Sequence, residues 1–386
     1  MVLDHDVPVA TALYDSWVTE RNAPEPRAFW VDALATAKRS ADRNRHEETL
    51  ELLGDLGTGG GPADLVFQVV LLESWSNMVL GRLDRALALA QRANDLAARA
   101  DFTDFDRADV MFHLGCCRLK LAEYSLAASL FTVALELCNR TVFPCDRLRA
   151  SILHWRSRCS QHQRDWNAAR HDVDCAIELA VGIGDSSTLG HAHFQAAAIA
   201  ERTGDLRLAR YHAEEAEGVF RALHDDLMLG RITNNLGGII FLQGDTTNAL
   251  LYLEDSMRIA LTAGNEADAA QAISSVAQIH LRSGHPELAE SQARNALQVL
   301  AGREDFLGEI GNAQLVLARA LLAQALYEDA EAALTVADRN FQILGLASQR
   351  AAVLMARGEV MLAQGACLEA AETYRSAAEA LQDFHF

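Results

Sequence analysis

An alanine recurs at nearly constant spacing along most of this 386-residue chain. The eight alanines are Ala86, Ala127, Ala169, Ala209, Ala249, Ala289, Ala330 and Ala370. Neighbouring members are 40 to 42 residues apart, and a second small residue, alanine or serine, follows each of them by seven positions. Seven residues make about two helical turns, so both small residues share one helical face. The pattern predicts eight repeated units, each with two helices in close contact.

Glycine marks the turn before the alanine-bearing helix in five of these units. These glycines are Gly81, Gly204, Gly244, Gly284 and Gly365. Glycine readily adopts the left-handed conformation in which many helices end. Asp205 and Asp245 follow directly, and aspartate is a preferred first residue of a helix. Each unit is therefore expected to consist of a helix, a tight turn and a second helix.

Two further features relate these units to a known repeat. The expected first helices carry Leu114-Gly115 and Leu236-Gly237, and the turns carry aromatic residues. These aromatic residues are Tyr124, Trp166 and Tyr327. From about residue 66 onward the units resemble tetratricopeptide repeats of the long, roughly 40-residue type, as in kinesin light chains, Leu-Gly-Asn adaptors and bacterial Rap and maltose-activator regulators. The resemblance implies an all-α fold, a right-handed α–α superhelix (solenoid) of about eight to nine helix-turn-helix repeats.

The N-terminal part, residues 1–62, differs from the regular array expected over residues 63–386. It begins with a predicted cap helix that ends near Pro24 and Pro26. Residues 27–56 have the pattern of a degenerate repeat with a shorter second helix. The glycine-rich segment 57–62 is then predicted to be a loop. It lacks the Gly-Lys-Ser/Thr ending of a phosphate-binding loop, so phosphate binding is not expected.

Net charge limits the partners of this chain. The formal charge is −19, which repels phosphate backbones, so direct nucleic-acid binding is not expected. No apolar run reaches the length of a membrane span, and no signal peptide is visible, so a cytoplasmic location is expected.

The seven cysteines include no Cys-x-x-Cys pair and are expected to be small core residues. Arginine greatly outnumbers lysine, which is typical of a GC-rich bacterial genome.

No motif in the sequence indicates catalysis, a cofactor or a metal. The most metal-like cluster is His191-Ala192-His193, with His212 on the next predicted helix. Residues two apart on a helix do not face the same way, so these are expected to be groove or surface histidines. The chain is therefore expected not to be an enzyme.

The first helices of the repeats carry the candidate binding residues. In the family that this chain resembles, these helices line a concave groove that holds the ligand. The residues expected in this groove are His154, Arg158, His191, Gln195, Arg231, Asn234, Asn235, Gln271, Gln278, Asn312 and Arg319. Amide side chains both donate and accept hydrogen bonds, and arginine binds carboxylates in a bidentate manner, so the set suits an extended peptide. Asn234-Asn235-Leu236-Gly237 also resembles the form of the long repeat whose asparagines contact bound peptide.

The leading functional hypothesis is therefore a non-catalytic module that binds a protein or peptide, either as a bacterial regulator or as a static adaptor. One alternative is the sensory portion of a signalling enzyme, for example ahead of a diguanylate cyclase domain. Another is a homo-oligomeric scaffold, with a homodimer formed through the C-terminal repeat, because the last helix lacks a polar cap.

Overall fold

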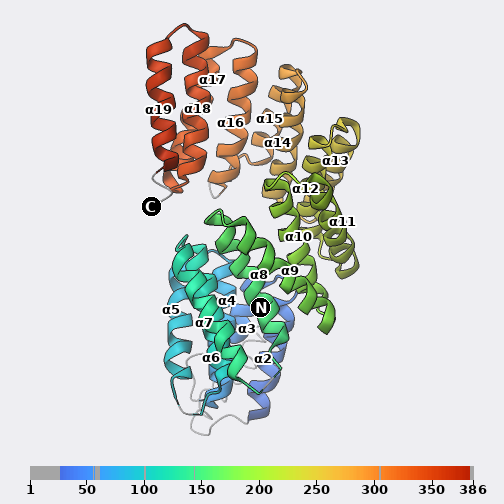
Figure 1. Cartoon of the computed structure of the whole chain (residues 1–386), viewed down its shortest axis with the longest axis vertical. Helices are drawn as coiled ribbons and strands as arrows, with labels where there is room; N and C mark the ends of the chain where they lie inside the picture. The colour runs from blue at the N-terminus through green and yellow to red at the C-terminus, as the bar shows by residue number, and fades with distance from the viewer. Residues whose placement is uncertain are drawn as a thin grey trace, which may run out of the picture. The chain divides into compact units, whose positions relative to one another are not determined.

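A computed structural model describes residues 27–54, 56, 61–99, 101–142, 144–303 and 306–382. These residues form eighteen α-helices and no strand (Figure 1). The all-α fold class predicted from the sequence is thus confirmed. The predicted cap helix and residues 57–60 of the glycine-rich segment lie outside the described residues.

The chain divides into two compact units, Met1–Thr188 and Leu189–Phe386, and the division falls inside helix α10. The helices of the first unit are α2 (Arg27–Ala41), α3 (His46–Leu53), α4 (Ala63–Val79), α5 (Leu83–Ala97), α6 (Asp104–Lys120), α7 (Tyr124–Arg140), α8 (Asp146–His162) and α9 (Trp166–Ile183). Those of the second are α10 (Ser186–Arg202), α11 (Leu206–Leu223), α12 (Asp226–Leu242), α13 (Thr246–Thr262), α14 (Glu266–Arg282), α15 (Pro286–Val299), α16 (Leu307–Ala323), α17 (Tyr327–Ile343), α18 (Ala347–Ala363) and α19 (Cys367–Gln382).

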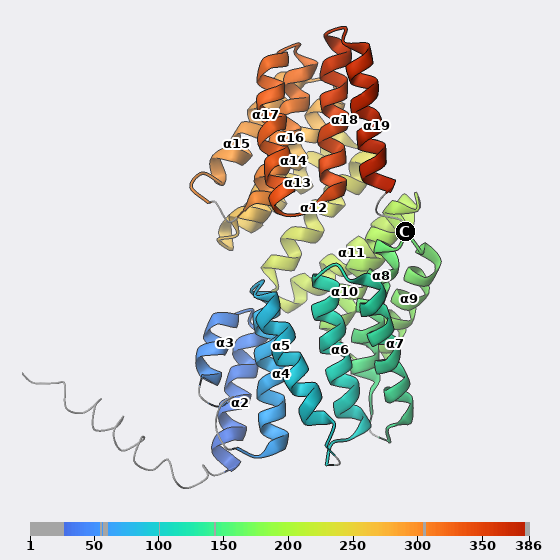
Figure 2. The same cartoon turned by 90° about the vertical axis from the view of Figure 1, so that its left-hand side faces the viewer.

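Consecutive helices pair as antiparallel hairpins, as α16 to α19 show in both views (Figure 2). The repeat alanines lie where the two helices of a hairpin meet, and all eight are buried. Gly115 and Gly237 lie on the opposing helices. A Cβ atom at these glycines would come within 2.5 Å of the Phe131 ring and 2.7 Å of Leu253. Small residues on both sides are therefore what allows this close approach.

The turns inside the hairpins follow the predicted chemistry. Gly81, Gly204, Gly244, Gly284 and Gly365 all have positive φ. Where glycine is absent, Ala122, Arg164 and Ala325 take the same left-handed conformation. Asp205 and Asp245 cap the helices that follow, since their carboxylates accept hydrogen bonds from the backbone N–H of Leu208 and Asn248.

Two helices lie within residues 27–56, where the sequence analysis expects a degenerate repeat. Helix α2 is followed by α3, which is only eight residues long. Trp30 and Leu34 of α2 and Leu53 of α3 are buried. They join the same apolar core as α4, so this part extends the array rather than forming a separate core.

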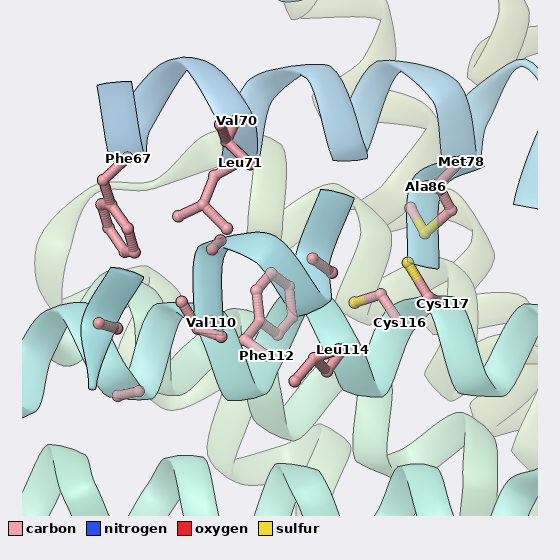
Figure 3. Close-up of a cluster of buried hydrophobic side chains, with 14 of the residues drawn as sticks. Phe67, Val70, Leu71, Met78, Ala86, Val110, Phe112, Leu114, Cys116 and Cys117 are labelled. Atoms are coloured by element: carbon pink, nitrogen blue, oxygen red, sulfur yellow. The ribbon is translucent and has the colours of Figure 1, made fainter. Parts of the chain in front are cut away.

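The core of the first unit is built from side chains of successive hairpins. Phe67 and Leu71 of α4 point toward Val110 and Phe112 of α6 (Figure 3). Cys116 and Cys117 belong to the same buried cluster, as do Cys138, Cys145 and Cys159. The prediction of core cysteines is wrong for the other two, since Cys175 is half-buried and Cys367 is exposed. Both lie on second helices of a hairpin.

Candidate binding site

Helix α12 presents polar and apolar residues on opposite sides. Ile232, Leu236 and Ile239 are buried against the neighbouring helices. Arg231, Asn234 and Asn235 fall between these positions, so the same helical period that buries the apolar residues brings the polar ones together on the other side. Of these three residues, Asn234 and Asn235 are half-buried and Arg231 is exposed.

These polar residues line a cavity of about 280 Å³ in the second unit. Its lining residues are Phe194 of α10, Gly230, Arg231, Asn234 and Asn235 of α12, Ser256 of α13, and Asp268 and Gln271 of α14. Three successive first helices therefore contribute to it. Four predicted groove residues meet here: Arg231, Asn234, Asn235 and Gln271.

Arg231 is held in place by an aspartate that the sequence did not single out. Its Nε donates a hydrogen bond of 2.8 Å to Oδ2 of Asp268, and Asn265 Nδ2 donates to the same oxygen. The cavity is therefore not simply cationic, because one arginine and one aspartate offset each other. Arg27 of α2 and Asp64 of α4, which are also 37 residues apart, form an ion pair as well.

Asn234 contributes an unusual atom to the cavity. Its Oδ1 is buried and has no hydrogen-bond partner among the described residues. A buried carbonyl oxygen without a partner costs about 1–3 kcal/mol. By contrast, the Ser256 hydroxyl is satisfied, since it donates to the Gly230 carbonyl over 2.7 Å. The Asn234 oxygen can accept an N–H from a ligand, while the terminal nitrogens of Arg231 can donate.

Other predicted groove residues of the second unit lie outside this cavity. Gln195 of α10 is half-buried, and the His191 ring packs edge-on against Phe220 at 5.3 Å. Gln278 of α14 is exposed, while Asn312 and Arg319 of α16 are half-buried. None of these five lines the cavity. Phe194, Gly230 and Ser256 line it but were not predicted, because apolar and small residues carry no polar signal in the sequence.

In the first unit, α8 carries the remaining two predicted groove residues. The Arg158 guanidinium lies over the Trp155 ring, 4.5 Å from its centroid. The His154 ring is perpendicular to that of Trp155, with 6.3 Å between centroids. Arg156, between them, points elsewhere and forms a bidentate ion pair with Asp172 of α9.

Two of the three clustered histidines, His193 and His212, contact each other. Over the described ranges, no group of three or more His, Cys, Asp or Glu side chains is arranged to hold a metal ion. His193 is buried, which corrects the prediction of a groove or surface residue, and its Nδ1 lies 2.9 Å from Nδ1 of His212. Burial, and then the charge of His212, lower the pKa of His193 to about 4. One nitrogen of this contact must donate and the other accept, so the two rings tie α10 to α11.

Comparison with known proteins identifies the fold. No family model and no curated protein sequence matches the chain. A Pyrococcus horikoshii signal-transduction ATPase with a tetratricopeptide repeat sensor matches 94% of this chain and 53% of its own, with a TM-score of 0.65 and 13% identity. The fold is that of a tetratricopeptide-like repeat array.

Two further solved structures share this tetratricopeptide-like fold along almost their whole length. The apo form of the quorum sensor NprR from B. thuringiensis has a TM-score of 0.63 at 15% identity, covering 92% of this chain and 97% of its own. A Rap protein in complex with Competence and Sporulation Factor has a TM-score of 0.58 at 17% identity, covering 90% and 100%. None of the helices among the described residues combines the length and apolarity needed to cross a membrane.

Proposed function

We propose that this chain is a non-catalytic binding module of a regulatory or adaptor kind, and that the cavity between α10, α12 and α14 holds an extended peptide segment. The observation that carries the proposal is the buried Oδ1 of Asn234, which has no partner among the described residues. The rest of the cavity lining includes two more amides, an arginine paired with an aspartate, and a phenylalanine. A peptide backbone offers N–H and C=O groups at regular intervals, which is what such a lining pairs with.

The lining residues also favour binding over turnover. Of the eight residues around the cavity, Ser256 alone has a hydroxyl, and its proton is engaged by the Gly230 carbonyl. None of the eight is a histidine or cysteine, and the one carboxylate, Asp268, accepts hydrogen bonds from Arg231 and Asn265. One structure of similar fold is named as an enzyme, aspartyl phosphate phosphatase F from Bacillus subtilis. The lining of the present cavity nevertheless includes neither a histidine nor a cysteine.

The comparisons support the peptide as ligand. NprR has also been solved in complex with its cognate peptide NprX, and that structure has a TM-score of 0.59 and 14% identity over 92% of this chain. The Rap structure likewise contains Competence and Sporulation Factor. Both show that a fold of this kind is compatible with a bound peptide.

Asn234→Leu is expected to raise stability and, at the same time, weaken peptide binding about tenfold. Leucine has a similar shape and removes a buried oxygen that has no partner, so the free energy of unfolding should rise by about 1 kcal/mol. The same change removes the acceptor that the peptide uses. Thermal denaturation followed by circular dichroism measures the first effect, and peptide selection measures the second.

The selection uses a phage-displayed library of random linear peptides on the immobilised full chain. Wild type is expected to enrich a family of peptides that Asn234→Leu and Arg231→Gln no longer retain. Asn295→Leu is the matched control, because Asn295 is exposed on α15, away from the cavity. Enrichment of the same peptides on Asn234→Leu as on wild type would show that this cavity is not the peptide site.

A further inference from the structure

Helix α8 in the first unit carries three neighbouring polar side chains with unused binding capacity. Arg158, Gln161 and His162 are spaced three and four residues apart, so Arg158 adjoins both of the others on the helix surface. Tyr124, at the start of α7, lies against them, since its ring stacks on that of His162 with 4.1 Å between centroids.

Arg158 is a half-buried cation without a counter-ion. Its one described contact is the Trp155 ring below it, and no Asp or Glu of the described residues pairs with it. Stacking covers one face of the planar guanidinium and leaves its N–H edges available. In a chain of net charge −19, an arginine that is partly removed from water and has no carboxylate beside it is unusual.

The groups around Arg158 do not supply the missing charge. Three titratable groups would favour the charged form of Arg158 if they were ionised, namely Cys116, Cys159 and Tyr124. Burial raises the pKa of the Cys116 thiol well above its ordinary value, that of Cys159 to about 12, and that of Tyr124 above its ordinary value. All three are therefore neutral at physiological pH, and Arg158 keeps an uncompensated positive charge.

Gln161 and His162 add hydrogen-bonding capacity beside this charge. Gln161 Nε2 is buried and has no hydrogen-bond partner within the described part of the chain. Partial desolvation and the charge of Arg158 lower the pKa of His162, so its imidazole is neutral at pH 7 and has one N–H to donate. The cluster thus combines a single positive charge with two neutral groups that can donate hydrogen bonds.

We propose that Arg158, Gln161 and His162 form a second ligand site, which binds a carboxylate group. A carboxylate is planar and carries a single negative charge, so it matches one guanidinium edge in a bidentate manner. A doubly charged phosphate calls for more than one cation, and α8 provides only Arg158 at this place. The site is independent of the cavity between α10, α12 and α14, and its failure would leave the proposed function intact.

The carboxylate can come from a peptide C-terminus or from an aspartate or glutamate side chain, and small probes separate these sources. N-acetylglycine represents the terminal carboxylate and N-acetylaspartyl amide the side chain. N-acetylglycinamide is the neutral control and inorganic phosphate the dianion. Binding is followed by the Nε–Hε resonance of Arg158 in protein labelled with ¹⁵N-arginine, assigned by its loss in Arg158→Gln.

A saturable, millimolar shift of the Arg158 resonance is expected with one or both carboxylates, and not with the neutral amide. Arg85→Gln, which changes an exposed arginine on α5, should leave the titration unchanged. Gln161→Leu should raise the melting temperature, because it removes an unsatisfied buried group, yet weaken carboxylate binding several-fold.

Three results would overturn the proposal. They are the absence of a saturable shift with either carboxylate, an equal shift with the neutral amide, and full carboxylate affinity in Gln161→Leu. Tighter binding of phosphate than of both carboxylates would equally contradict the assignment of a single-charge site. If Arg158→Gln does not fold, Arg158→Lys supplies the assignment, because lysine also lacks the Nε–Hε group but keeps the charge.

Discussion

Arg156→Ala is expected to lower the free energy of unfolding of the first unit by about 3 kcal/mol. Asp172 is only 3% exposed, and the Nε and one terminal nitrogen of Arg156 donate to its two carboxylate oxygens at 2.8 and 2.6 Å. Removing the arginine leaves a buried carboxylate without a counter-ion between α8 and α9. Urea denaturation followed by circular dichroism measures the loss.

Two further variants test the cause of this loss. Arg258→Ala removes an ion pair of 2.9 Å with Asp255, in which both side chains are exposed, and should change stability by at most about 0.5 kcal/mol. The double variant Arg156→Met, Asp172→Leu removes both charges and should be close to wild type. If Arg156→Ala and Arg258→Ala destabilised the chain equally, the burial of Asp172 would not be the reason.

Ala249→Leu is expected to destabilise the α12–α13 hairpin by about 3 kcal/mol through overpacking. Ala249 is fully buried, and its carbonyl oxygen would lie only 3.2 Å from a Cβ atom placed on Gly237 of the opposing helix. A leucine can fit only if the two helices separate. Because repeats are stabilised mainly by their neighbours, amide hydrogen exchange should accelerate first in α12 and α13 and then in the adjacent hairpins.

Ala332→Leu provides the control for this substitution. Ala332 is exposed on α17, so the same added volume should change stability by no more than about 0.5 kcal/mol. A melting temperature of Ala249→Leu equal to that of wild type would mean that the repeat register deduced from the alanines is wrong.

The hairpin repeat was predictable because its determinants are local and recur. The repeat alanines, the turn glycines such as Gly204, and the cap Asp205 each act within one hairpin, and their spacing repeats along the chain. A pattern of this kind defines where helices start, end and touch before any tertiary contact is known. The short α3 was also expected, and it ends just before Gly54, which has a positive φ.

The candidate site was only half predictable because its remaining members come from other repeats. The polar face of α12 was visible in Arg231, Asn234 and Asn235, but the Asp268 that fixes Arg231 lies on α14, at the start of the next repeat. Phe194 contributes an apolar wall that no polar pattern marks. Likewise, the missing counter-ion of Arg158 is a property of packing, since α8 by itself does not show which charges its neighbours bring.

A peptide N–H is expected to pair with the Oδ1 of Asn234, and N-methylation of a selected peptide tests this pairing most directly. Isothermal titration compares the unmodified peptide with versions methylated at one backbone nitrogen at a time, against wild type and Asn234→Leu. At one position, methylation should weaken binding to wild type about tenfold or more, which is the expected loss for a buried hydrogen bond. In Asn234→Leu the same methylation should cost little, so the two changes are not additive. If methylation at every position weakened binding to both proteins by equal factors, the pairing with Asn234 would be contradicted.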